Sequence, residues 1–231
     1  DGVTAVSLLY SFLDAMGCDV VYYIPSRLEE GYGVHPQAIE KIVQTGASLI
    51  ITVDTGITAF EAAEKADRLG VRLVITDHHK PSSDLPKAAA VVDPHRVDDA
   101  SGLEYLAGVG VAFYLVRALA GGEDEDLLSF YSQFAAVGTI ADVVPLVHDN
   151  RRIVRAGLRL LNERPLIGLD VLAEMAGLQG KQIVSTNVAF GLAPRINAAG
   201  RMGNAETALR LLLSDTRETA SYYATELSAY N

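Results

Sequence analysis

The chain contains 231 residues, of which 49% are apolar and 21% are charged. This composition supports one or two packed domains and excludes a mainly disordered protein. Acidic residues outnumber basic residues 29 to 19, and the net charge of −10 argues against broad electrostatic wrapping of nucleic acid. The sequence has no run of about 18 apolar residues and does not open on a basic leader, so we expect neither a transmembrane helix nor a signal peptide.

Apolar periodicity predicts alternating helices and strands in the first 95 residues. Val3 to Met16 repeat at helical spacing, and Val20 to Ile24 form an apolar run typical of a strand. The alternation continues with helices over 36–44 and 58–69 and with strands over 49–53, 71–75 and 88–92. Continuous apolar runs of this length suit strands that are buried on both faces. We therefore predict an α/β fold with a doubly wound, mainly parallel sheet.

From about residue 103 the strand-like runs stop and helical periodicity takes over. The expected helices cover 109–119, 126–144, 150–162, 169–176 and 205–213. We accordingly expect an α/β core over 1–102, a mainly helical part over 103–215, and the start of a long helix over 216–231. The single cysteine, Cys18, cannot form an internal disulfide, and we expect a buried structural thiol in a reducing cytoplasm.

Carboxylates and imidazoles follow three of the predicted strands. Asp54 comes directly after the second strand, Asp77-His78-His79 follow the third, and Asp93 follows the fourth. Ligands of open parallel sheets bind beyond the carboxyl ends of the strands, so these side chains are expected at one edge. Taken alone, Asp54 is also consistent with a plain N-cap of the next helix. The three strand ends together favour a binding site.

Adjacent histidines after a buried strand have no packing rationale. Neutral imidazole and carboxylate oxygen form the mixed ligand set used for zinc, manganese or iron, so His78 and His79 predict a metal site. Asp77 is suited to orient one of the two imidazoles through a hydrogen bond.

Two further carboxylates are candidate metal ligands. Asp142 lies in the otherwise apolar segment 135–145, where a lone carboxylate must be paired, hydrogen-bonded or metal-bound to offset its desolvation. Asp1 directly precedes the first predicted helix, and its position alone does not distinguish a functional acid from an ordinary one.

Two segments carry residues suited to contact a phosphate or a base. Arg195, Asn197 and Arg201 fall in a stretch rich in small residues, and guanidinium groups bind phosphate in a bidentate manner. Arg27 and Tyr32 are close in the sequence, and the tyrosine offers an aromatic platform for a base. The alternatives are a loop with surface arginines for the first segment and a simple turn for the second.

These segments together resemble the DHH phosphoesterase superfamily and, within it, the RecJ family of single-strand-specific exonucleases. The four superfamily motifs correspond to residues 1–5, 54–56, 77–79 and 138–142. Three further stretches are similar to RecJ proteins specifically, and they cover 27–33, 108–113 and 194–203. The resemblance extends over nearly the whole chain.

The resemblance implies a site with two divalent ions, manganese or magnesium. Asp54 would bridge the ions, Asp1, His78 and Asp142 would be further ligands, and His79 would face the scissile phosphate. Such a pair of ions, about 3.5–4 Å apart, activates a water and stabilises the attacking and leaving oxygens of the phosphate.

By the same analogy, Arg195 and Arg201, together with Asn197, would hold phosphates of the strand. The implied activity is 5′ to 3′ hydrolysis of single-stranded DNA in recombination and repair, in the cytoplasm of a bacterium. The implied partners are single-stranded DNA, a single-strand-binding protein and a helicase, with no membrane.

RecJ proteins carry further aspartates and a strand before the position of Asp1, and DHHA1 and OB domains after the catalytic part. One metal position is therefore expected to be incomplete in this chain. Two other functions remain open: a phosphodiesterase acting on dinucleotides or short oligonucleotides, and a non-catalytic DNA-binding scaffold. Retention of Asp54, His78, His79 and Asp142 argues against the scaffold.

Overall fold

The computed structural model describes residues 1–26, 30–122, 125–201 and 204–229, without the side chains of 125–129 and 201. The elements in chain order are α1 Gly2–Ala15, α2 Pro36–Gln44, β1 Leu49–Val53, α3 Phe60–Leu69, β2 Arg72–Thr76, β3 Ala90–Val92, α4 Gly108–Leu119, α5 Glu125–Ala141, α6 His148–Glu163, α7 Ile167–Met175, α8 Ser185–Asn187, the π-helical turn η1 Val188–Leu192, α9 Ala193–Arg201, α10 Ala205–Leu212 and α11 Arg217–Ala229.

The described strands form one parallel sheet in the order β1-β2-β3. Leu49 to Val53 of β1 pair with Arg72 to Thr76 of β2, and β2 pairs in turn with β3. All three carboxyl ends therefore lie at one edge of the sheet. This arrangement confirms the predicted α/β fold with a parallel sheet and a helical continuation.

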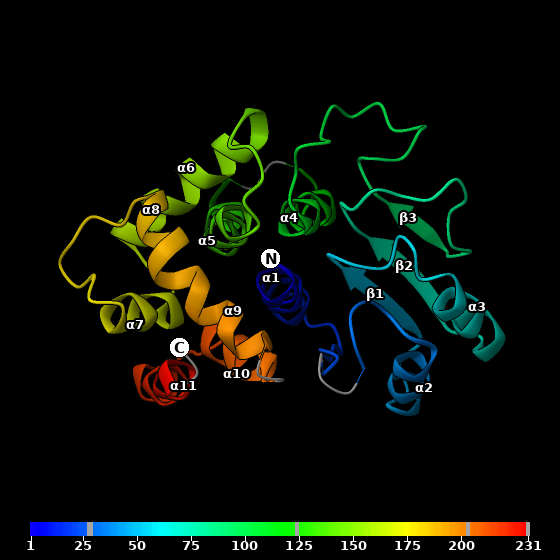
Figure 1. Ribbon diagram of the computed structural model, residues 1–231, viewed down its shortest axis with the longest axis horizontal. Coiled ribbons are helices and arrows are strands. Elements are labelled where there is room, and N and C mark those ends of the chain that lie inside the picture. Colours follow the sequence, from blue (N-terminus) through cyan, green and yellow to red (C-terminus); the bar gives the residue numbers. More distant parts are fainter. Residues whose placement is uncertain (27–29, 123–124, 202–203, 230–231) are drawn as a thin grey trace.

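Helices cover both faces of the sheet because the strand side chains alternate between the faces. Ile50, Leu73 and Ile75 pack with residues of α2 and α3 in one apolar cluster. Ile51 and Val53 belong instead to the main core, together with residues of α1 and α4. Figure 1 shows α2 and α3 on the outer side of the sheet and α1 and α4 on the inner side.

Helix α1 lies at the centre of the molecule, between the sheet and the helical half (Figure 1). The helical half packs against the side of α1 that faces away from the sheet. Residues of α1, α4, α5, α6, α7, α9, α10 and α11 share the main core. The predicted helical continuation is therefore built onto the same core as the inner face of the sheet. None of the helices within the described ranges is both long and apolar enough to cross a membrane.

The prediction of a strand over Val20 to Ile24 is wrong. This run pairs with none of the described strands, and Val21 is 62% exposed. Its tyrosines make contacts of another kind: the Tyr22 ring lies edge-on to Tyr10 at 5.4 Å, and its hydroxyl donates to Glu206. An apolar run becomes a strand only where a neighbouring backbone completes its hydrogen bonds. Cys18 is also exposed, contrary to the expected buried thiol.

A glycine sets how closely α5 and α6 approach. A Cβ atom on Gly157 of α6 would lie 2.3 Å from the Ser132 carbonyl oxygen and 2.4 Å from the Ala136 Cβ, both in α5. Packed helices yield little to such a clash because their backbones are held by neighbouring elements.

Replacing Gly157 with alanine is expected to destabilise the fold by about 1–3 kcal/mol, the usual cost of overpacking. The matched control is Gly191→Ala, where the added methyl would meet Leu178 at an ordinary 3.5 Å. That control is expected to leave the free energy of unfolding within about 1 kcal/mol of the parent value. Urea unfolding of both variants measures the difference, and equal midpoints would contradict the packing argument.

Candidate metal centre

Four side chains from distant parts of the chain converge at the carboxyl edge of the sheet. The His78 Nε2 atom lies 3.1 Å from Asp54 Oδ1, 3.6 Å from Asp1 Oδ2 and 3.8 Å from Asp142 Oδ2. Asp54 follows β1 and His78 follows β2, whereas Asp1 precedes α1 and Asp142 follows α5. The parallel sheet supplies two of these positions and the packing of α1 and α5 supplies the others.

The Asp1 carboxylate is held by the start of α4. Its two oxygens accept the backbone N–H groups of Gly108 and Val109, at 2.7 and 2.8 Å. These amides belong to the first turn of α4, where unpaired N–H groups and the helix dipole favour an anion. Although the backbone of Asp1 precedes α1, its side chain thus occupies the N-terminus of a different helix.

Asp54 adopts a backbone conformation that is unusual for a residue other than glycine. Its φ of 59° lies in the left-handed region, and such strain is often found at functional sites. Two glycines make room for its side chain, since a Cβ on Gly108 would lie 2.4 Å from Asp54 Oδ1 and one on Gly2 would lie 3.1 Å from Oδ2. The alternative of a plain N-cap does not hold, because the N-cap of α3 is Ala59.

Asp142 lies just beyond α5, which ends at Ala141 rather than at the predicted residue 144. The next residue, Val143, has a left-handed φ of 63°, a conformation that is strained for a β-branched residue. At this residue the chain turns away from the helix axis. This turn leaves the Asp142 carboxylate at the end of α5, where it faces His78.

Both histidines are oriented through Nδ1. The His78 Nδ1 atom lies 3.1 Å from the Leu106 carbonyl oxygen, so it carries the proton that this oxygen accepts. The His79 Nδ1 atom lies 2.7 Å from Oδ1 of Asp77, a buried carboxylate whose other oxygen accepts the Ile57 N–H. In both rings Nε2 is therefore the nitrogen with the available lone pair. Asp77 orients His79 rather than His78.

The polar atoms at the centre fit a divalent cation. Asp54 Oδ1 and His78 Nε2 are buried, and no group in the described part of the chain is aligned to hydrogen-bond either atom. Ligand atoms within 4.8 Å of one another form two groups, Asp54 with His78 and His79, and Asp1 with His78 and Asp142. Carboxylate oxygen and imidazole nitrogen suit manganese. His78 is common to both groups, whereas the resemblance implied that Asp54 would bridge the two ions.

The carboxylates change the titration of His78. Burial alone would lower the pKa of this imidazole, but the contact with Asp54 and the negative charges of Asp54, Asp142 and Asp77 outweigh burial and raise it. In the absence of a cation, the centre therefore favours a proton on His78.

Asp93, at the end of β3, lies beside the centre but in neither group of ligands. Burial raises its pKa, and the charge of Asp77 adds to the effect. Its Oδ1 accepts the His95 N–H at 2.7 Å, so this carboxyl shapes the turn after β3.

The residues expected to bind substrate are not gathered in the same way. Arg195 and Asn197 lie on α9, where the Arg195 Nη1 donates to the Gly191 carbonyl at 2.6 Å and Asn197 is exposed. The segment is helical, entered through η1, rather than a loop. Tyr32 is 76% exposed before α2. Arg27 lies outside the described residues, as does the side chain of Arg201, the last residue of α9.

Sequence reasoning missed the backbone groups that hold the ligands. The Leu106 carbonyl and the amides of Gly108 and Val109 bind His78 and Asp1 without any characteristic side chain. The available signal was the glycine at 108, because only a residue without Cβ lets Asp54 approach the helix start.

The fold and the site define a parallel α/β protein with carboxylates and imidazoles gathered at the carboxyl edge of its sheet. The family described as "DHH family, N-terminal domain" matches residues 1–139. The chain belongs to the DHH family.

Proteins of similar sequence carry the name RecJ. The single-stranded-DNA-specific exonuclease RecJ of Bacillus subtilis (strain 168) is 42% identical over 231 residues, covering 100% of this chain and 29% of the relative. RecJ of Escherichia coli (strain K12) is 37% identical, covering 100% of this chain and 42% of the relative. The chain thus spans less than half the length of these curated relatives.

Two solved structures are close in fold. A crystal structure of exonuclease RecJ bound to manganese matches with a TM-score of 0.88 and 41% identity, covering 99% of this chain and 57% of that one. RecJ from Thermus thermophilus in complex with Mn²⁺ matches with a TM-score of 0.84 and 36% identity, covering 99% of this chain and 33% of that one.

In the metal-free protein, the Asp54→Asn substitution is expected to lower the pKa of His78, because it removes the nearest negative charge. Since the folded pKa lies above the ordinary 6.5, the stability that His78 contributes is full below that pH and is lost as pH rises through the folded pKa. NMR titration of the imidazole measures the shift. Asp67→Asn, in an exposed pair with Lys87, is the control, and an unchanged His78 curve in Asp54→Asn contradicts the assignment.

Proposed function

We propose that this chain is the catalytic part of a metal-dependent exonuclease that hydrolyses phosphodiester bonds of single-stranded DNA from the 5′ end. The observation that carries the proposal is the convergence of Asp1, Asp54, His78 and Asp142 at the sheet edge. It is supported by 36–42% identity, over the whole chain, to several RecJ exonucleases.

The proposed cofactors are two divalent cations, manganese or magnesium. Asp1, Asp54, His78 and Asp142 would hold them, with His78 in both groups of candidate ligands. When bound, such ions lower the pKa of a bound water and stabilise negative charge on the phosphate. Three carboxylates around one imidazole supply the negative charge that such ions require.

His79 and Asp77 would act on the substrate side of the centre. The side chain of His79 is 61% exposed, so a phosphate group can approach it from solvent. Asp77 accepts the Nδ1–H of His79. When the ring is the imidazolium and also carries a proton at Nε2, that proton would be donated to a phosphate oxygen of the scissile bond. Asp77 is a positioning residue, because its oxygens are occupied by Ile57, His78 and His79.

Substrate binding is proposed for the arginine-containing segments and the exposed tyrosine, namely Arg195, Asn197, Arg201, Arg27 and Tyr32. Guanidinium groups hold backbone phosphates, and an exposed aromatic ring stacks on a base. A single-strand-binding protein and a helicase are the proposed protein partners, in the cytoplasm of a bacterium. The residues after 215 are proposed to lead into a DHHA1 domain that adds to the grip on DNA.

Asp54→Ala and His78→Ala are each expected to lower manganese-dependent cleavage of 5′-labelled single-stranded DNA by more than about 100-fold. Loss of a metal ligand costs at least as much as loss of a group that only supports one. The fold should remain, because both residues follow strands rather than fill the core. The matched control is Asp67→Ala, an exposed aspartate of α3 that should cleave at the parent rate.

The measurement compares this chain with a version extended upstream through the family's further aspartates and downstream through its additional domains. Parent-level cleavage by the Asp54 or His78 variants contradicts the metal assignment. Hydrolysis of dinucleotides without degradation of longer strands, in both versions, favours a small-substrate phosphodiesterase instead. DNA binding without any hydrolysis points to a scaffold.

A further inference from the structure

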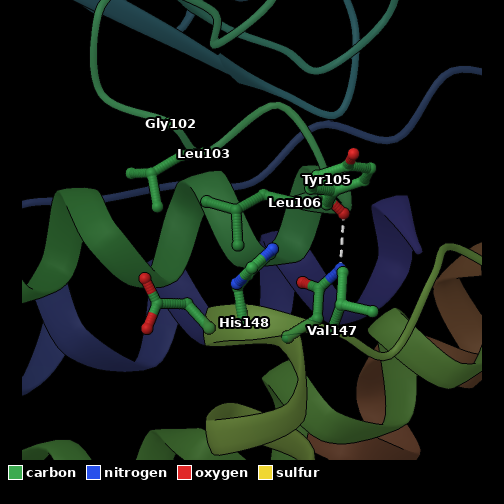
Figure 2. A pocket seen from close by; sticks show the side chains of 8 residues that line it. Gly102, Leu103, Tyr105, Leu106, Val147 and His148 are labelled. Atoms are coloured by element: carbon green, nitrogen blue, oxygen red, sulfur yellow. Dashed lines mark hydrogen bonds between the residues drawn. The ribbon is translucent and has the colours of Figure 1, made fainter.

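Asn150, in the first turn of α6, is buried between two loops of the centre. It is 1% exposed, and its Nδ2 group donates to the carbonyl oxygens of both Tyr105 and Pro145, the latter at 2.9 Å. Figure 2 shows the hydrogen bond to Tyr105 beside a small pocket that Leu106 and His148 also line. Only the NH₂ end of the amide can serve two carbonyl acceptors, so the orientation of this side chain is fixed.

One of the two loops carries the backbone groups that orient metal ligands. Tyr105 directly precedes Leu106, whose carbonyl accepts the Nδ1–H of His78. Two residues further, the amides that begin α4 hold both oxygens of Asp1. The position of the 105–109 segment therefore sets the positions of His78 and Asp1 together.

The other loop carries a third ligand. Pro145 lies three residues after Asp142, in the connection between α5 and α6. Left-handed residues flank this connection: Val143 near its start has a φ of 63°, and His148, the first residue of α6, has a φ of 44°. Such conformations persist only where surrounding contacts determine them. The bonds of Asn150 are contacts of that kind, and the His148 ring also lies 5.9 Å from the Tyr105 ring.

We propose that Asn150 is a positioning residue of the metal centre. By joining the Tyr105 and Pro145 carbonyls, it fixes the spacing between Asp142 on one loop and His78 and Asp1 on the other. The inference rests on the proposed metal centre. A pre-organised set of ligands binds a cation more tightly, because less conformational entropy is lost on binding.

A second asparagine of the same helix provides a matched control. Asn162, near the other end of α6, donates from Nδ2 to the carbonyls of Leu158 and Ile183, and its Oδ1 accepts the Ile183 N–H. It therefore also ties α6 to another segment through backbone carbonyls. Its partners, Leu158 and Ile183, belong to neither of the two loops that carry candidate metal ligands, so replacement of Asn162 reports the structural effect alone.

The experiment measures Mn²⁺ binding by calorimetry in the whole protein and in four variants, Asn150→Asp, Asn150→Ala, Asn162→Asp and Asn162→Ala. Both changes at Asn150 are expected to weaken Mn²⁺ binding by about 10–100-fold, the usual effect of removing a group that supports a ligand. Both changes at Asn162 should leave it within about twofold. The added charge of Asn150→Asp would by itself strengthen cation binding, so weaker binding isolates the loss of positioning.

Hydrogen exchange without metal gives an independent readout. Changes at Asn150 should speed exchange of the amides of residues 105–109, whereas changes at Asn162 should speed exchange at Ile183. Parent-level Mn²⁺ binding in the Asn150 variants, or equal weakening in the Asn162 variants, overturns the proposal. Failure of the parent protein to bind Mn²⁺ overturns the metal centre itself and this inference with it. If either Asn150 variant does not fold, Asn150→Ser, which keeps one donor, is judged by the same criteria.

Discussion

The first turn of α4 is the element on which the rest of the centre depends. Its amides hold the carboxylate of Asp1, the carbonyl just before it orients His78, and the missing side chain of Gly108 leaves room for Asp54. One short backbone segment therefore sets the position of three candidate ligands. A change in the direction of α4 would move all three at once.

The main energetic constraint is the crowding of negative charge. Asp1, Asp54 and Asp142 all lie within 4 Å of one imidazole nitrogen, and like charges at such distances repel. The dipole of α4 offsets part of this repulsion at Asp1. When no cation is bound, a proton on His78 offsets a further part of the repulsion, which is why the pKa of this histidine is raised. Divalent cations would replace that proton and neutralise the remaining charge.

The sequence predicted those features that local patterns carry. The alternation of apolar runs predicted the parallel sheet, and polar residues directly after these runs pointed to Asp54 and His78 as neighbours. The strand over Val20 to Ile24 could not be decided locally, because pairing depends on another segment. The role of Asn150 was equally hidden, since an asparagine becomes a link between loops only when the fold brings two carbonyls to it. Side-chain patterns likewise say nothing of the Leu106 carbonyl.

The most direct test of the metal centre is anomalous diffraction from a crystal of the whole protein soaked in manganese. We predict manganese peaks among Asp1, Asp54, His78 and Asp142, and two occupied positions should be about 3.5–4 Å apart. Peaks only elsewhere on the protein, or no manganese peak at all, would contradict the account.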